Sequence, residues 1–237
     1  MITLESIRKY PPADIIGDTG LGNKMFQIAG TIGIAKRNNL EYGFEEWESQ
    51  KYFKNRLPEV DNSEYILKEL PWGYSPVDTI DKTAIQGYMQ DYRYWHEYSD
   101  IIRYYFEMQD ICQPLTNTIG IHFRAYGETD VHPECDWSYY DKAIMCMPAG
   151  KRLVVFTDNI ERAKKVIKFN CEFRSGVPIE DFYLLSRCDA VICSNSTFPW
   201  WAAWLSGGKT IIPSRWFGGR KSHLSTTGLH YPNWIKI

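Results

Sequence analysis

The sequence predicts an α/β fold with parallel sheets, and three observations lead to this prediction. Segments with the pattern of strands and of helices alternate through the second half of the 237-residue chain. In the first half, a glycine-rich turn leads into a helical pattern, as in a strand–loop–helix unit. Hydrophobic residues make up 44% of the chain and charged residues 24%, which is typical of a globular protein and excludes a disordered one. Because strands that alternate with helices form βαβ units, we expect the sheets to be parallel.

The first elements are a strand, a glycine loop and a helix. Ile15 and Ile16 predict a short strand, and residues 17–23 (GDTGLGN) predict a glycine-rich turn. Apolar side chains then recur at steps of four, four and three residues, which places them on one face of a helix. These side chains are Met25, Ile28, Ile32 and Ala35. Lys36 and Arg37, followed by two asparagines, predict the end of this helix.

The middle of the chain has a weaker pattern. Residues 40–83 are polar and aromatic and contain three prolines, so we expect little regular structure there. A strand is expected over 84–91 and a helix over 91–108. Residues 109–117 have the composition of a linker, and we place a domain boundary in it.

This boundary gives two predicted domains, 1–110 and 111–237, and the second one alternates regularly. Its predicted strands are 118–123, 151–158, 189–194 and 209–213. Its predicted helices are 138–147, 160–169, 180–188 and 198–205. Ligands of parallel sheets bind beyond the carboxyl ends of the strands, and six polar residues lie there in this sequence. They are His122, Arg124, Asp158, Asn195, Ser196 and Thr197.

Charge and hydropathy exclude several classes of protein. The chain has 27 Lys and Arg against 29 Asp and Glu, a net charge of −2, which excludes a uniformly basic nucleic-acid-binding protein. No apolar run approaches the ~20 residues of a membrane span, and the first residues lack the apolar segment of a signal peptide. We therefore expect a cytoplasmic protein with no transmembrane segment. The six cysteines form no C-x-x-C pair and have no histidine at zinc-ligand spacing, so we expect six reduced thiols.

His122 and Arg124 are candidates for an anion site. They flank Phe123 in the predicted strand 118–123 and therefore share one face at its end. A guanidinium there suits a phosphate, which it can bind with two hydrogen bonds. The alternative is a surface arginine paired to an acid, beside a histidine whose hydrogen bonds are satisfied.

The segment SNSTFPWWAAWL predicts a second anion-binding feature. It joins a strand to a helix through Ser196 and Thr197, and the amino end of a helix favours an anion. The alternative is an ordinary helix cap by Ser or Thr. The tryptophans at 200, 201 and 204 have helical spacing and are expected in the core rather than at a ligand.

Two further features leave alternatives open. Asp158 follows an apolar strand and either accepts hydrogen bonds from a base or ribose, or caps the helix that begins near Ile160. The glycine loop 17–23 matches neither the P-loop nor the Rossmann fingerprint and is a weak signal by itself.

Together, four ordered blocks resemble glycosyltransferase family 11, the α-1,2-fucosyltransferases. GLGNKMFQIA resembles the opening G-x-L-G-N-Q-M-F-Q-Y-A, and GIHFR resembles the H-x-R-R-G-D block. VVFTDNIERAKK resembles the F-S-D-D-x-x-W-x-K block, and SNSTFPWWAAWL is close to S-N-S-S-F-S-W-W-A-A-W-L. The segments IIPSRWF and LHYPNWIKI also resemble the end of the family's sequences.

The resemblance implies a GT-B-like α/β fold, in which two Rossmann-type domains with parallel sheets face a cleft. It implies an enzyme that transfers L-fucose from a GDP-L-fucose donor to a glycan acceptor, with inversion and in an α-1,2 linkage. No metal and no other cofactor would be required, and no nucleic acid would take part. Domain 1–110 would hold the acceptor, and domain 111–237 would hold the nucleotide sugar.

The resemblance also implies roles for individual residues. His122 and Arg124 would contact the diphosphate, and Asp158 would hold the guanosine. The full donor-binding set would be Gly22, Asn23, His122, Arg124, Asp158, Asn195, Ser196, Thr197 and Phe198. Arg124, with His122, would stabilise the departing diphosphate. The base is not identified, and the loop carboxylates Asp18, Glu128 and Asp130 are candidates, each with a solvated surface acid as the alternative.

The sequence departs from the family pattern at three positions. Ala125 stands in place of the second arginine of H-x-R-R, Gly127 in place of the following acid, and Lys24 in place of glutamine. These departures keep two alternatives open. One is a transferase that uses another nucleotide sugar, and the other is a non-catalytic module that binds a nucleotide or a glycan.

Overall fold

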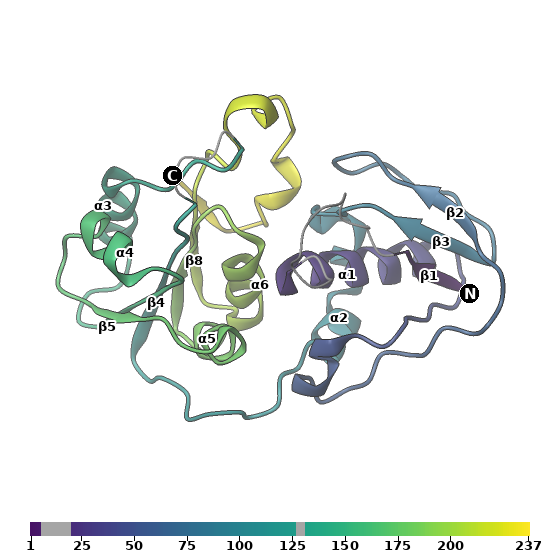
Figure 1. Cartoon of the computed structure of the whole chain (residues 1–237), viewed down its shortest axis with the longest axis horizontal. Helices are drawn as coiled ribbons and strands as arrows, with labels where there is room; N and C mark the ends of the chain where they lie inside the picture. Colours follow the sequence, from purple (N-terminus) through teal and green to yellow (C-terminus); the bar gives the residue numbers. More distant parts are fainter. Residues whose placement is uncertain (6–19, 127–130) are drawn as a thin grey trace. The chain divides into compact units, whose positions relative to one another are not determined.

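The chain divides into two compact units, which are described separately. The computed structural model describes residues 1–5, 20–126 and 131–237. The N-terminal unit contains Met1–Gln109 and a returning segment, Ser225–Leu229. The C-terminal unit contains Asp110–Leu224 and His230–Ile237. Figure 1 shows a sheet with helices in each of the two units.

The N-terminal unit contains a parallel three-stranded sheet in the order β1-β3-β2. Its elements are β1 (Ile2–Leu4), β2 (Ile66–Glu69), β3 (Thr83–Gln86), α1 (Leu21–Arg37) and α2 (Ser99–Tyr105). The predicted helix after the glycine turn is confirmed as α1, and the four apolar side chains that predicted it are buried. The predicted strand at Ile15 and Ile16 lies outside the described residues.

Three predictions for this unit are wrong in detail. Strand β2 lies within 40–83, where little regular structure was expected, and its side chains are mostly exposed, so it lacks a buried apolar run. The strand predicted over 84–91 ends at Gln86, ahead of Met89 with a φ of 48°. The helix predicted over 91–108 is broken at Trp95, whose φ of −136° and ψ of −2° are not helical. Short 3₁₀ turns precede this break and follow it, and only α2 is α-helical.

The C-terminal unit contains a parallel six-stranded sheet in the order β6-β5-β4-β7-β8-β9. Its strands are β4 (Thr118–Phe123), β5 (Arg152–Thr157), β6 (Glu172–Arg174), β7 (Ala190–Ile192), β8 (Lys209–Ile212) and β9 (Ile235–Lys236). Its helices are α3 (Trp137–Met145), α4 (Ile160–Val166), α5 (Pro178–Leu185) and α6 (Thr197–Ser206). All eight predicted elements are present within three residues of their predicted ends. The edge strands β6 and β9 were not predicted, because two or three residues are too few to show a period.

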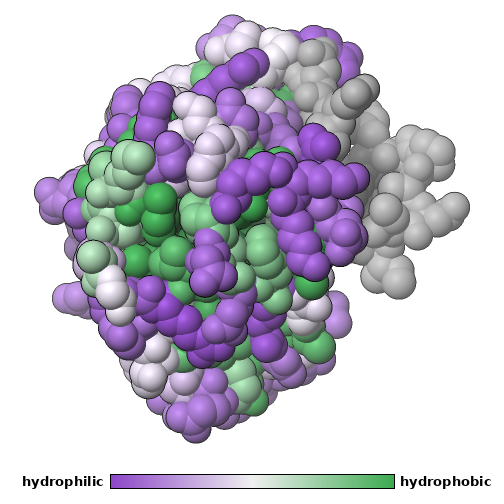
Figure 2. Space-filling view, turned by 90° about the vertical axis from the view of Figure 1, so that its left-hand side faces the viewer, coloured by the Kyte–Doolittle hydropathy of each residue, from purple (hydrophilic) through white to green (hydrophobic). Residues whose placement is uncertain are grey.

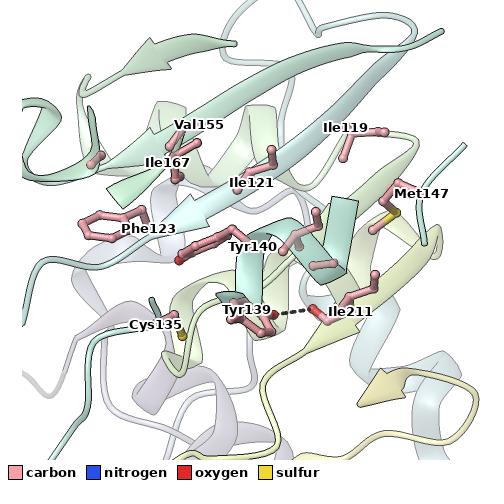
Figure 3. Close-up of a cluster of buried hydrophobic side chains, with 14 residues drawn as sticks. Ile119, Ile121, Phe123, Cys135, Tyr139, Tyr140, Met147, Val155, Ile167 and Ile211 are labelled. Atoms are coloured by element: carbon pink, nitrogen blue, oxygen red, sulfur yellow. Dashed lines mark hydrogen bonds between the residues drawn. The ribbon is translucent and has the colours of Figure 1, made fainter. Parts of the chain in front are cut away.

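Hydrophobic side chains from the central strands and from α3 form the core of this unit (Figure 3). The hydroxyl of Tyr140 donates to the carbonyl of His122 at 2.9 Å, and that of Tyr139 donates to the carbonyl of Cys193 at 2.5 Å. Burial raises the pKa of both phenols. Two buried hydrogen bonds thus connect α3 to the carboxyl ends of β4 and β7. Figure 2 shows the unit from the side that carries α3 and α4 in Figure 1, where apolar side chains gather among hydrophilic ones.

Helix α6 is buried along most of its length. The prediction that its tryptophans belong to the core is confirmed, since Trp200, Trp201 and Trp204 are at most 2% exposed. The helix ends at Ser206, one residue beyond the predicted end, and its cap is Gly207, whose φ of 67° is strained for any residue with a side chain. Among the described residues, no helix is long and apolar enough to cross a membrane.

Candidate functional site

A hollow of about 290 Å³ opens in the C-terminal unit at the carboxyl ends of β4 and β5. The amino ends of α5 and α6 complete it. It is lined by His122, Arg124, Phe156, Thr157, Asp158, Ser175, Gly176, Pro178, Asp181, Ser196 and Phe198. The structure thus brings together five residues singled out from the sequence. They are His122, Arg124, Asp158, Ser196 and Phe198.

His122 is buried at the end of β4, with 6% of its surface exposed. Its Nδ1 lies 2.8 Å from Oγ of Ser194, and its ring packs against Phe198 with the ring centres 5.4 Å apart. Burial, and secondarily the charge of Arg124, lower the pKa of the imidazole to about 3. The ring is therefore neutral at physiological pH. It can exchange hydrogen bonds with a ligand but supplies no positive charge and is a weak base.

Arg124 supplies the positive charge of the hollow. Its Nη1 lies 2.8 Å from Oδ2 of Asp158, and its side chain is 47% exposed. The guanidinium also lies over the ring of Tyr126, 5.7 Å from the ring centre. The phenol of Tyr126 in turn donates to the carbonyl of Asn195 at 3.0 Å. The alternative interpretation expected an arginine paired to an acid and a histidine with a hydrogen-bond partner. Both features are present, and both residues line the hollow.

Asp158 does not cap the helix that follows it, so that interpretation is wrong. The cap of α4 is Asn159, whose Oδ1 accepts from the N–H of Arg162 at 2.9 Å. The carboxylate of Asp158 is directed to β4 instead, where Oδ1 accepts from the N–H of Ala125 at 3.0 Å. The cap lies one residue after the expected position. Asparagine and aspartate cap helices equally well, so the sequence alone does not distinguish Asn159 from Asp158.

The amino end of α6 contributes Ser196 and Phe198 to the hollow. Ser196 is the cap of this ten-residue helix, and its hydroxyl accepts from the N–H of Phe198 at 3.4 Å. Thr197 is the first residue of α6 and does not line the hollow. The end of the helix nevertheless directs the positive end of its dipole to this place, which favours an anion.

Asn195 lies behind the hollow. Its side chain is 1% exposed, and Nδ2 donates to the carbonyls of Pro133 at 2.7 Å and Trp216 at 3.1 Å. The amide therefore ties the end of β7 to two neighbouring loops and does not line the space in which a ligand could lie.

Sequence reasoning missed the wall that precedes and begins α5. Asp181 is buried, and its carboxylate accepts from Nε of Arg174 and, at 2.8 Å, from the N–H of Gly176. Ser175, Gly176 and Pro178 complete this wall. A proline at the first position of a helix followed by acids in its first turn was the available signal, but it marks only the start of a helix.

Several candidates lie elsewhere. Gly22 and Asn23 belong to α1 in the N-terminal unit, where Oδ1 of Asn23 accepts from Nε2 of Gln90 at 2.9 Å. Asp18, Glu128 and Asp130 lie outside the described residues. In the described part of the chain, no group of three or more His, Cys, Asp or Glu side chains could hold a metal ion.

Comparison with known proteins gives one family. The sequence model described as "Glycosyl transferase family 11" matches residues 24–237. An α-1,2-colitosyltransferase of Escherichia coli is 28% identical in an alignment that covers 64% of this chain and 61% of that protein. The O-antigen biosynthesis glycosyltransferase WbnK of E. coli is 25% identical over 78% of this chain and 68% of its own length. Galactoside α-(1,2)-fucosyltransferase 2 of Sus scrofa is 25% identical over 81% of this chain and 68% of its own length. The chain thus spans about two thirds of the length of these relatives, and less for the first.

Solved structures show the same fold. The fucosyltransferase NodZ from Bradyrhizobium matches with a TM-score of 0.55 at 14% identity, covering 86% of this chain and 93% of that one. Arabidopsis thaliana FUT1, solved as the R284K mutant in complex with GDP, matches with a TM-score of 0.53 at 12% identity. That match covers 89% of this chain and 69% of that one. The predicted GT-B-like α/β fold with parallel sheets is confirmed.

Proposed function

Because the chain belongs to glycosyltransferase family 11, we propose that it transfers L-fucose from GDP-L-fucose to a hydroxyl group of a glycan, in an α-1,2 linkage. The observation that carries this proposal is the hollow at the carboxyl ends of β4 and β5. It combines one half-exposed guanidinium, one neutral imidazole and the amino end of a helix. These are the groups that bind a diphosphate without a metal ion.

In the proposed reaction, the acceptor oxygen attacks the anomeric carbon of the donor from the side opposite the leaving group. The bond from that carbon to the β-phosphate oxygen breaks, and the electron pair stays on GDP. Arg124 stabilises the charge that develops on this oxygen, and the helix dipole of α6 adds to it. Attack from the opposite side gives inversion at the anomeric carbon.

The proton of the acceptor hydroxyl must pass to a base. His122 is unsuitable, because an imidazole with a pKa near 3 takes up a proton poorly at neutral pH. We assign His122 a hydrogen bond to the diphosphate instead. Asp18, Glu128 and Asp130 remain the proposed candidates for the base. Gly22 and Asn23 are proposed to approach the donor from the N-terminal unit, which is proposed to hold the acceptor.

One observation favours a second candidate function, transfer of a different sugar. The relative at 28% identity is named as a colitosyltransferase, and this chain has Ala125 where the family has a second arginine. The diphosphate site would be the same in both functions, and the pocket for the sugar or for the nucleobase would differ.

A panel of nucleotide sugars tests both functions. The full chain is incubated with GDP-L-fucose, GDP-mannose, UDP-galactose or UDP-glucose and a galactoside acceptor, and release of the nucleoside diphosphate is measured. We expect acceptor-dependent release from GDP-L-fucose, undiminished by excess EDTA because Arg124 and backbone dipoles bind the diphosphate. Release from another donor alone would support the second function, and tight GDP binding without any release would indicate a non-catalytic module. Loss of activity with EDTA and recovery with Mn²⁺ would contradict metal independence.

A further inference from the structure

Both carboxylate oxygens of Asp158 are directed to the end of β4. Oδ1 accepts from the backbone N–H of Ala125 at 3.0 Å, and Oδ2 lies 2.8 Å from Nη1 of Arg124. One oxygen thus fixes the course of the chain after Arg124, and the other fixes the guanidinium itself.

The register of the sheet explains this arrangement. β4 and β5 are parallel neighbours, and their last paired residues are Phe123 and Thr157. Arg124 and Asp158 are the next residues of the two strands, so they are opposite each other where the sheet ends. The pairing of β4 with β5 is therefore sufficient to bring Arg124 and Asp158 together.

Within the described residues, no helix cap and no further hydrogen bond of the fold uses this carboxylate. Asn159 caps α4, and Oγ1 of Thr157 accepts from the N–H of Asn159 at 3.0 Å. The pair of Arg124 and Asp158 is 47% and 37% exposed, and an ion pair with this exposure contributes little to stability. The ion pair therefore matters because it fixes the position of the guanidinium, and not because it stabilises the fold.

We propose that Asp158 is a positioning residue that holds the guanidinium of Arg124 at the hollow, ready for the donor diphosphate, and that it does not read the nucleobase. The ion pair engages Nη1, and the planar guanidinium carries other N–H donors that can face an anion. Tyr126 supports the guanidinium from a second side. This inference rests on the proposed function and replaces the guanosine contact that the family resemblance implies for Asp158.

Two other roles of Asp158 predict different results. A carboxylate that bound the base would contribute equally to the binding of guanosine and of GDP. A carboxylate that only reduced the positive charge of the hollow would weaken GDP binding, so its removal would tighten it. A positioning residue contributes to the binding of ligands that contain a diphosphate, and it does so only while Arg124 is present.

The experiment measures dissociation constants of GDP and guanosine for the full chain by calorimetry and NMR titration. The variants are Asp158→Asn, Arg124→Ala and the double variant. Asparagine has the shape of aspartate and can still accept from Ala125, but it loses the ion pair. We expect Asp158→Asn to weaken GDP binding about tenfold, the size of one charged hydrogen bond, and to leave guanosine binding unchanged. In the Arg124→Ala background, the same substitution should leave GDP binding unchanged.

The matched control is Glu172→Gln, on the neighbouring strand β6. Glu172 pairs with Arg152, the first residue of β5, and both are exposed and do not line the hollow. This variant loses a similar ion pair and should bind GDP as the wild type does. If Asp158→Asn does not fold, as judged by its melting curve, Asp158→Ser provides the same comparison, since its hydroxyl can accept from Ala125.

Three results would overturn the inference. In the first, Asp158→Asn weakens the binding of GDP and of guanosine equally. In the second, Asp158→Asn weakens GDP binding as much in the Arg124→Ala background as in the wild type. In the third, Asp158→Asn binds GDP more tightly than the wild type. If the wild-type chain does not bind GDP, the proposed function fails and the inference fails with it. Wild-type GDP binding combined with any of the three results rejects the inference alone.

Discussion

His122 and Arg124 lie two residues apart and line the same hollow, but burial gives them different electrostatic properties. The buried imidazole has a pKa near 3 and is neutral, whereas the half-exposed guanidinium keeps its charge. The sequence predicted that the two residues share a face, because side chains two apart in a strand do so. It could not predict the neutrality of His122, which follows mainly from its burial against residues distant in sequence such as Phe198.

Replacing Arg124 should lower turnover more than GDP affinity. The β-phosphate gains charge as the bond to the sugar breaks, so a fork of donors stabilises the transition state more than the ground state. We expect Arg124→Ala to reduce kcat by about 10²–10³, by analogy with the loss of one preorganised donor. Arg124→Lys keeps the charge but loses the bidentate geometry, and should also reduce kcat strongly. Steady-state kinetics with GDP-L-fucose measure both effects.

Arg152→Ala is the matched control for this series, because Arg152 is an exposed arginine at the distant end of β5. It should retain wild-type kcat. Ala125→Arg restores the second arginine of the family pattern, and its turnover should rise or stay level. A near-normal kcat for Arg124→Ala would show that Arg124 is a structural residue.

The buried imidazole of His122 should make stability depend on pH. Its pKa is about 3 in the folded chain and about 6.5 in the unfolded chain, so between these values only the unfolded state binds the proton. The free energy of unfolding therefore rises with pH from 3 to 6.5, by up to ~1.4 kcal/mol per unit, and is level above 6.5. Denaturant unfolding of the wild type and of His122→Asn between pH 4.5 and 8 measures this dependence. The difference between the two proteins should be constant above pH 7 and shrink below pH 6; a difference that stays constant throughout would contradict a buried neutral imidazole.

At the scale of elements, the prediction succeeded where strands and helices alternate regularly and failed where local hydrogen bonds or exposed side chains interrupt the pattern. Strand β4 has six buried residues and was predicted with its observed ends. The helix predicted over 91–108 failed because Asp91 accepts from the N–H of Arg93, and this local hydrogen bond favours a tight turn. The apolar pattern of this segment also predicts that five side chains are buried: Trp95, Ile102 and Phe106 are buried, whereas Ile101 and Tyr105 are half-buried. Apolar side chains can thus be assigned to a core even where their secondary structure is assigned wrongly.

Helix α1 should not tolerate alanine at Gly33, where it crosses the backbone of Tyr94. A Cβ at Gly33 would lie 1.9 Å from the carbonyl oxygen of Tyr94, which is backbone. Alanine improves helix propensity by ~1 kcal/mol, but overpacking against backbone costs about 1–3 kcal/mol or more. We expect Gly33→Ala to lower the free energy of unfolding by at least ~1 kcal/mol. Gly218→Ala is the control, since its Cβ would meet the flexible end of the Arg215 side chain, which can move. Equal stability of both variants would contradict the close crossing at Gly33.

At the scale of the whole molecule, two units carry separate parts of the proposed reaction. The C-terminal unit holds the hollow with Arg124, and its regular βαβ pattern explains why five of the eleven residues that line the hollow were predicted. The wall at Asp181 was missed because its contacts with Arg174 and Gly176 arise only when β6 and α5 meet. The N-terminal unit has short strands.

The six cysteines are free thiols, as predicted. Burial raises the pKa of Cys135 and Cys188 to about 12, so these two thiols should be unreactive. Reductant should therefore leave the melting temperature of the whole chain unchanged. A disulfide would contribute ~2–5 kcal/mol, and its reduction would lower the melting temperature by several degrees.

Hydrogen–deuterium exchange of the full chain with and without GDP tests most directly the claim that the hollow of the C-terminal unit is the donor site. GDP should slow exchange in the segments that line the hollow, and UDP at the same concentration should do so less. These segments are 122–126, 156–158, 175–181 and 196–198. The same protection should be weaker in Arg124→Ala. Absence of protection by GDP in these segments, or GDP-dependent protection confined to residues outside them, would contradict the account.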